Sequence, residues 1–158
     1  VKMENGIFHT SMGMTKDIVV SETDSGNPEP TADIEIEISG TDGIIIKYSI
    51  GPGPKTFSVF YKDQKAHENF VGHDVNLVKI EEGGSLEALE SWMNWADPKG
   101  LIEPAPAGIT FMGGTNDMPG GSKAYFHVNL QPGNYVLISE VPAPSTKNMM
   151  KTFVVGSK

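Results

Sequence analysis

The chain has 158 residues and carries 20 acidic side chains against 12 lysines and arginines, a net charge of −8. This length fits one domain that buries roughly two-thirds of the surface its unfolded chain exposes. The negative charge disfavours nucleic acid and anionic membrane surfaces as partners. No cysteine is present, which excludes disulfides, zinc–thiolate sites and cysteine nucleophiles. The apolar runs are far shorter than the ~20 residues of a transmembrane helix, so no membrane span is expected.

The first residues suggest where the protein works. The sequence opens on Val1 and Lys2 rather than methionine, which is typical of a mature product after removal of an export signal. We therefore expect a periplasmic or secreted protein. Residues 1–31 are rich in turn formers and are expected to be an N-terminal arm, in which only residues 17–22 have the character of an edge strand. Residues 32–158 are expected to form the domain.

The first half of the domain shows strand periodicity. Residues 33–38 alternate without a fault, placing Ile34, Ile36 and Ile38 on one face. The glycines of residues 40–43 predict a tight turn. Further strands are expected over residues 44–50, 56–61 and 71–80.

The spacing becomes helical over residues 85–96. Ser85 is the expected N-cap, and the apolar face contains Leu86, Leu89, Met93 and Ala96. Trp95 points away from that face. Its indole therefore either packs under the proline-rich loop that follows or forms a surface for recognising a ligand or partner.

The second half begins with an expected loop up to residue 121. Residues 122–130 then alternate, with Ala124, Phe126, Val128 and Leu130 facing inward and His127 outward. Strands over residues 135–141 and 151–155 complete the chain. Short strands, many turns and one inserted helix predict an all-β Greek-key sandwich.

Two motifs resemble the cupredoxin family. Residues 133–139, Gly-Asn-Tyr-Val-Leu-Ile-Ser, resemble the family's G-x-Y-x-x-x-C segment, which precedes a loop with a histidine and a methionine. Residues 72–75, Gly-His-Asp-Val, resemble its H-N-V segment, which supplies the first histidine ligand. The resemblance covers roughly residues 33–155. It implies a cupredoxin-type sandwich with His73 at the first ligand position and Ser139 at the cysteine position.

The departures from the family pattern decide the cofactor. Blue copper depends on a short bond to a thiolate, and a serine hydroxyl is a hard, poorly ionised substitute. Residues 140–151 also contain no histidine. We therefore expect no cofactor, and no electron transfer through a type 1 copper site.

Two sets of soft ligands keep copper or silver binding open. His73 with Met149 and Met150 is one set, and His9 with Met12 and Met14 is the other. Imidazole and thioether groups suit Cu(I) and Ag(I). The alternative is that the two C-terminal methionines fill the core and that the N-terminal set lies in the arm.

Catalysis is a third alternative. His67, Glu68, His73 and Asp74 lie close in sequence and offer an acid–base pair, but no nucleophile or paired-acid motif accompanies them. The first hypothesis is therefore a non-enzymatic exported module that binds an unknown protein or surface ligand. A periplasmic copper- or silver-binding protein is second, and a hydrolase or isomerase using the His67/His73 region is third.

Overall fold

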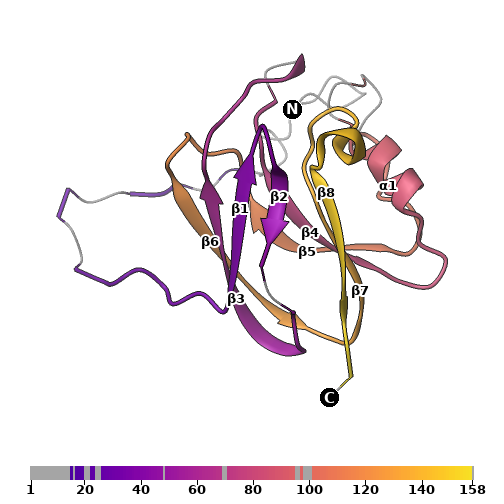
Figure 1. Cartoon of the computed structure of the whole chain (residues 1–158), viewed down its shortest axis with the longest axis horizontal. Coiled ribbons are helices and arrows are strands. Elements are labelled where there is room, and N and C mark those ends of the chain that lie inside the picture. Colours follow the sequence, from indigo (N-terminus) through magenta and orange to yellow (C-terminus); the bar gives the residue numbers. More distant parts are fainter. Residues whose placement is uncertain are drawn as a thin grey trace.

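The computed structural model describes residues 15, 17–19, 22–23, 26–47, 49–68, 71–94, 97 and 101–157. They form two four-stranded sheets with one helix beside them (Figure 1). The first sheet has the order β2-β1-β3-β6, made of Gly43–Ile46, Ile34–Ser39, Gly53–Tyr61 and Lys123–Leu130. The second has the order β5-β4-β7-β8, made of Ile109–Thr115, Val75–Ile80, Gly133–Ile138 and Met150–Val155.

The chain passes repeatedly between the two sheets. It changes sheet from β3 to β4, from β5 to β6 and from β6 to β7. β1 and β3 run parallel, with Ile36 opposite Val59, whereas the other pairings are antiparallel. The prediction of an all-β sandwich is confirmed.

The core lies between the sheets and follows the predicted alternation. Ile34, Ile36 and Ile38 are buried, while Glu35 between them is exposed. From the other sheet, Leu77 and Leu137 join the same cluster. Burial of each such side chain stabilises the folded state by roughly 1.5–3 kcal/mol. This apolar layer therefore holds the two sheets together.

Helix α1 (Leu86–Trp92) covers the outer face of the second sheet. The Ser85 side chain accepts a hydrogen bond from the Ala88 amide at 3.2 Å, which confirms the predicted cap. Leu89 and Met93 are buried in a second cluster with Val78 and Val136. The helix ends at Trp92, earlier than predicted.

Strand β5 lies in the segment that the sequence predicted to be loop. The strand was not predicted because Gly113 and Gly114 interrupt the alternation of apolar and polar residues from which strands are recognised. A side chain at Gly114 would meet the Val75 carbonyl at 2.2 Å, and one at Gly113 would meet the Phe126 ring at 3.3 Å. Glycines therefore serve here to let neighbouring strands approach closely.

Other strand boundaries differ by a few residues. β2 ends at Ile46, β3 begins at Gly53, β4 begins only at Val75, and β7 spans Gly133–Ile138. The later start of β4 leaves residues 71–74 outside the ladder. His73 and Asp74 therefore lie in an irregular segment at the end of the sandwich.

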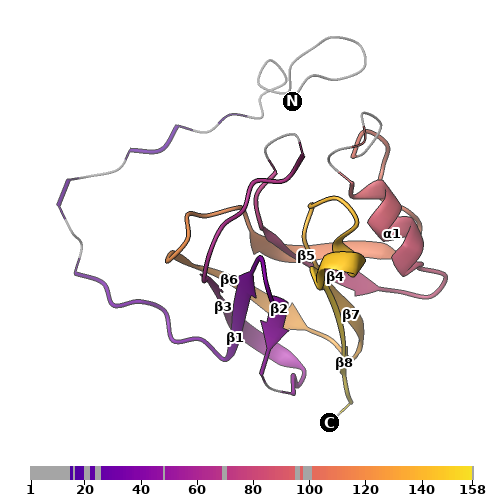
Figure 2. The same cartoon turned by 45° about the horizontal axis from the view of Figure 1, so that its top comes forward.

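The described residues of the arm lie outside the sheets. Residues 17–19 and 22–23 belong to no strand, and Ile18 and Val19 are largely exposed. Residues 26–33 lead into β1 (Figure 2), where the Tyr125 hydroxyl and the Lys123 ammonium donate to Glu29. Within the part of the chain described, no helix has the length and apolar character of a membrane span.

Candidate functional site

His73 is fixed at the end of the sandwich by a side-chain clamp. Its backbone N–H donates to Gln64 Oε1 at 2.6 Å, and Gln64 Nε2 donates to the His73 carbonyl at 2.8 Å. The same Nε2 donates to the Met118 carbonyl at 2.9 Å. The amide of Gln64 thus replaces a neighbouring strand for a residue that lies outside the ladder, which satisfies its buried backbone groups.

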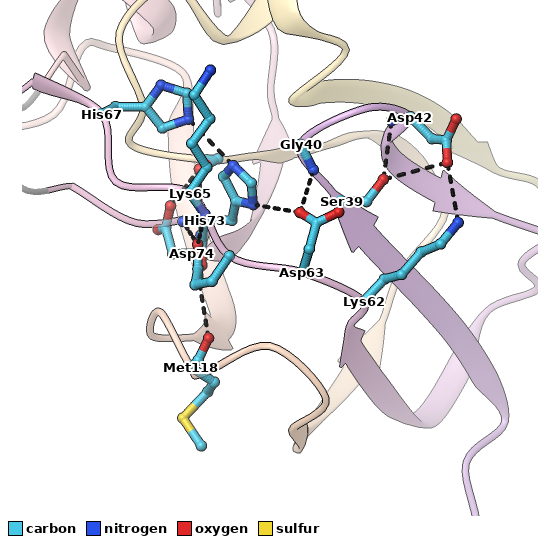
Figure 3. A network of polar contacts seen from close by, with 12 residues as sticks. Ser39, Gly40, Asp42, Lys62, Asp63, Lys65, His67, His73, Asp74 and Met118 are labelled. Atoms are coloured by element: carbon cyan, nitrogen blue, oxygen red, sulfur yellow. Dashed lines mark hydrogen bonds and ion pairs between the residues drawn. The ribbon is translucent and has the colours of Figure 1, made fainter.

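The His73 ring is fully buried and meets a second imidazole. His67 Nε2 lies 3.2 Å from His73 Nε2, so one nitrogen donates and the other accepts. On the other side, His73 Nδ1 faces Asp63 Oδ1 at 4.0 Å, and that oxygen accepts from the Gly40 amide at 2.7 Å (Figure 3). No described residue hydrogen-bonds to His73 Nδ1.

Burial lowers the pKa of both histidines. For His67, the charges of His73 and Lys147 add to this effect of burial, and for His73 the Lys65 ammonium acts in the same direction. A lowered pKa from an ordinary value near 6.5 leaves both rings neutral at pH 7. The site therefore presents two uncharged imidazoles.

The two imidazoles form part of the wall of a pocket of about 310 Å³. Three loops build it: β1–β2, β3–β4, and the segment from the 3₁₀ helix η3 (Pro144–Lys147) into β8. The described residues that line it are Gly40, Thr41, Lys65, His67, His73, Thr146, Lys147, Asn148 and Met149. Its volume is at the lower end of the range of small-molecule sites, ~300–1,000 Å³.

The η3 loop is held firmly against the rest of the pocket. The Ile44 amide donates to the Asn148 carbonyl at 2.9 Å, and the Met149 amide donates to the Pro144 carbonyl at 2.8 Å. Gly43 permits this approach, because a side chain there would collide with the Asn148 backbone. Lys147 Nζ donates to the Pro142 carbonyl, so one ammonium of the wall is anchored.

Ser139 and Asp74 form a buried pair. The Ser139 hydroxyl donates to Asp74 Oδ1 at 2.6 Å, and the Glu140 amide donates to the same oxygen at 2.8 Å. Asn76 Nδ2 donates to Asp74 Oδ2 at 2.6 Å. Ser139 stands at the family's cysteine position and Asp74 at its asparagine position, so the two departures from the motifs are partners.

Further carboxyl groups lie near this pair. Burial together with the charges of Asp74 and Asp117 raises the pKa of Glu140 to about 7. Burial also raises the pKa of Asp74, against the effect of its hydrogen bonds. Asp74 and Glu140 therefore form an acidic cluster in which negative charge on either carboxyl is costly.

The structure separates the predicted metal ligands. His73 and Met149 line the same pocket, whereas Met150 packs with the second core cluster, beside Val78 and Val136. His9, Met12, Met14 and Trp95 lie outside the described residues. In the described part of the chain, no three His, Asp or Glu side chains gather as metal ligands do.

A type 1 copper centre does not fit these residues. Ser139 supplies no thiolate, and its hydroxyl is fully buried and engaged by Asp74. No histidine follows it before β8. His73, the one matching imidazole, contacts His67 instead. The chemistry of the donor set excludes the short thiolate bond on which blue copper depends.

Three contributors were not predicted. Gln64 has no signal in a motif, because its role depends on the loop folding back beside His73. Lys65 and Lys147 come from loops distant in sequence and meet only in the folded chain. Of the pocket residues, only His67, His73 and Met149 were singled out from the sequence.

Comparisons with known proteins agree with this architecture. No protein-family model and no curated protein matches the chain. Among solved structures, sodium-dithionite-reduced auracyanin from the photosynthetic bacterium Roseiflexus castenholzii matches with a TM-score of 0.54 and 19% identity, over 78% of this chain and 95% of that one. Auracyanin B matches with a TM-score of 0.50 and 18% identity, over 84% and 96%. The chain therefore has a cupredoxin-like fold, and it contains no cysteine.

Proposed function

We propose that the protein is a non-enzymatic, exported binding module on a cupredoxin-like fold, and that its ligand site is the pocket beside His73. The observation that carries this proposal is the pocket itself. Three loops from distant parts of the sequence converge on it, and each is anchored from behind by hydrogen bonds. A preformed cavity with a few fixed polar groups is the usual form of a small-molecule site.

The hydrogen bonds around Ser139 support a non-catalytic role for the protein. Its hydroxyl has no accessible surface and already donates to Asp74. A nucleophile needs an accessible oxygen beside a base that accepts its proton. The pocket histidines contact each other rather than a hydroxyl. A hydrolase or isomerase is therefore the weakest of the three hypotheses.

Copper or silver binding through His73 and Met149 remains the alternative. Its support is the 3.2 Å separation of the two Nε2 atoms, close to the ~3.3 Å between two nitrogens that bind one tetrahedral ion at ~2.0 Å. Against it, Lys65 and Lys147 line the same pocket, and ammonium groups oppose a cation. We rank it second.

A fragment screen tests the proposal. ¹⁵N-labelled protein is mixed with a library of neutral and charged fragments, and the amide signals of Gly40, Thr41, Asn148 and Met149 are followed. We expect some fragments to shift these signals selectively. The proposal is overturned if no fragment shifts the pocket amides, or if protein dialysed after purification retains stoichiometric copper.

Export is a separate part of the proposal. The cupredoxin-like fold motivates it. Fractionation of cells that produce the protein from its own gene tests it, and we expect the protein outside the cytoplasm. Recovery with a cytoplasmic marker would contradict export while leaving the pocket proposal intact.

A further inference from the structure

The pocket beside His73 is basic in a protein that is strongly acidic overall. Lys65 and Lys147 line it, and none of the described lining residues is an aspartate or glutamate. The whole chain carries a net charge of −8. Two of its 12 basic side chains thus share one cavity without a carboxylate in the wall.

The two acids that act on the histidine rings, Asp63 and Glu68, do not line the pocket. Asp63 accepts the Gly40 amide and faces His73 Nδ1, on the side of the ring away from His67. Glu68 is near enough to His67 for its charge to act on that ring. Neither residue is among those that line the cavity, so neither neutralises the ammonium groups from within it.

The hydrogen-bond donors also outnumber their partners in the wall. Lys147 Nζ has three donor hydrogens, and one is used by the Pro142 carbonyl. Lys65 lines the same pocket and is near enough to His67 for its charge to act on that ring. Thr41 adds a hydroxyl at the opposite loop. An acceptor with negative charge satisfies such a set best.

We infer that this pocket binds the carboxylate or phosphate group of a small anionic molecule, with Lys65 and Lys147 as its counter-charges. The inference rests on the proposed function, since it names the ligand class for the same pocket. It also gives a role to Lys65 and Lys147, which would have none in a metal site. The carboxylate and phosphate share the required chemistry, and separate titrations distinguish them.

The test is a titration of ¹⁵N-labelled protein with sodium phosphate and, separately, sodium acetate, at constant pH and at an ionic strength held with sodium chloride. At least one anion should give saturable shifts at Thr41, His67 and Asn148. Lys65→Met keeps the length of the side chain and removes its charge. We expect it to weaken binding roughly tenfold, the effect of losing one charge-assisted hydrogen bond.

Two further variants control the result. Lys123→Met removes a lysine that pairs with Glu29 and does not line the pocket, and it should leave affinity unchanged. Lys147→Met loses the bond to the Pro142 carbonyl as well as charge, so Lys147→Arg is the better probe of charge alone and should retain binding. Thermal melting confirms that each variant is folded.

The outcomes separate the two claims. If neither anion shifts the pocket signals while neutral fragments do, the inference is wrong and the proposed function stands. If neither the anions nor the fragments shift the pocket signals, both the inference and the proposed function are wrong. A titration with silver nitrate in nitrate buffer covers the metal alternative: stoichiometric Ag(I) binding, without binding of phosphate or acetate, would overturn the inference. Equal losses in Lys65→Met and Lys123→Met would also overturn it.

Discussion

The basic pocket around His73 and the acidic cluster around Asp74 begin at adjacent residues. The His73 ring meets His67 among lysines, whereas the Asp74 carboxylate meets Ser139 and the Glu140 amide. His73 lines the pocket, whereas Asp74 does not. One peptide unit therefore separates a site for negative charge from a site where negative charge is costly.

The two regions also differ in how completely their polar groups are satisfied. Asp74 Oδ1 accepts two hydrogen bonds and Oδ2 accepts one. In the pocket, Lys65 and Lys147 contribute ammonium groups to the lining, and each ammonium carries three donor hydrogens. A satisfied buried network stabilises the fold, while unsatisfied donors at an open cavity are what a ligand uses. The comparison assigns stability to the Asp74 side and binding to the His73 side.

Replacing Asp74 should have the largest effect on stability. Asp74→Ala leaves the Ser139 hydroxyl, the Glu140 amide and the Asn76 amide without their acceptor. The free energy of unfolding should fall by about 4 kcal/mol, since each stranded buried donor costs ~1–3 kcal/mol. Urea denaturation measures it. Asp74→Asn keeps one acceptor oxygen and should lose much less; equal losses would contradict the role assigned to the carboxylate.

Glu140 should make the protein more stable at mildly acidic pH. Its pKa is raised to about 7 in the folded state, so between about pH 4.5 and 7 the folded state binds more protons than the unfolded state, and stability falls as pH rises. Glu140→Gln removes this penalty. It should stabilise the protein by up to about 3 kcal/mol at pH 8 and by little near pH 4.

Urea denaturation across this pH range checks the prediction for Glu140. Glu82→Gln, at an exposed turn, is the matched control and should leave the pH dependence unchanged. A Glu140→Gln gain that is constant with pH, or larger in acid, would show that charge on Glu140 is not the cause.

The Gln64 clamp should have a smaller effect on stability but a direct one on the pocket. Gln64→Leu removes the partners of the His73 amide and of two carbonyl groups. We expect a loss of about 2 kcal/mol and weaker phosphate binding, because the loop that carries Lys65 loses its anchor. Gln131→Leu, at an exposed turn, is the control. If the Gln64→Leu protein is destabilised but binds phosphate as before, the hydrogen bonds of Gln64 do not position the pocket.

Local patterns predicted most of the fold. The alternation of Ile34, Ile36 and Ile38 and the Ser85 cap depend on neighbours in sequence, and both are confirmed. Strand β5 was missed because Gly113 and Gly114 owe their identity to contacts with β4 and β6. The spacing of residues in the sequence does not predict such contacts between strands.

The candidate site was predictable only in part. His73 and Ser139 were found because they align with motifs. The bond from Ser139 to Asp74 and the place of Lys65 and Lys147 in one pocket bring together segments distant in sequence. His67 and His73, which contact each other within one loop, were grouped from the sequence. Met150, grouped with Met149 by adjacency, packs on the other side of its strand. Side chains of adjacent strand residues point to opposite faces, so two neighbouring methionines are not expected to bind the same metal ion.

The Ser139→Cys variant tests the central claim most directly. If the copper site of the fold has been replaced by a buried polar network and a separate pocket, restoring the thiol beside Asp74 does not restore the missing second histidine. Addition of Cu(II) to the purified variant should then give no intense thiolate-to-copper absorption and no copper retained on dialysis. An intense, stable blue band with one copper per chain would contradict the account.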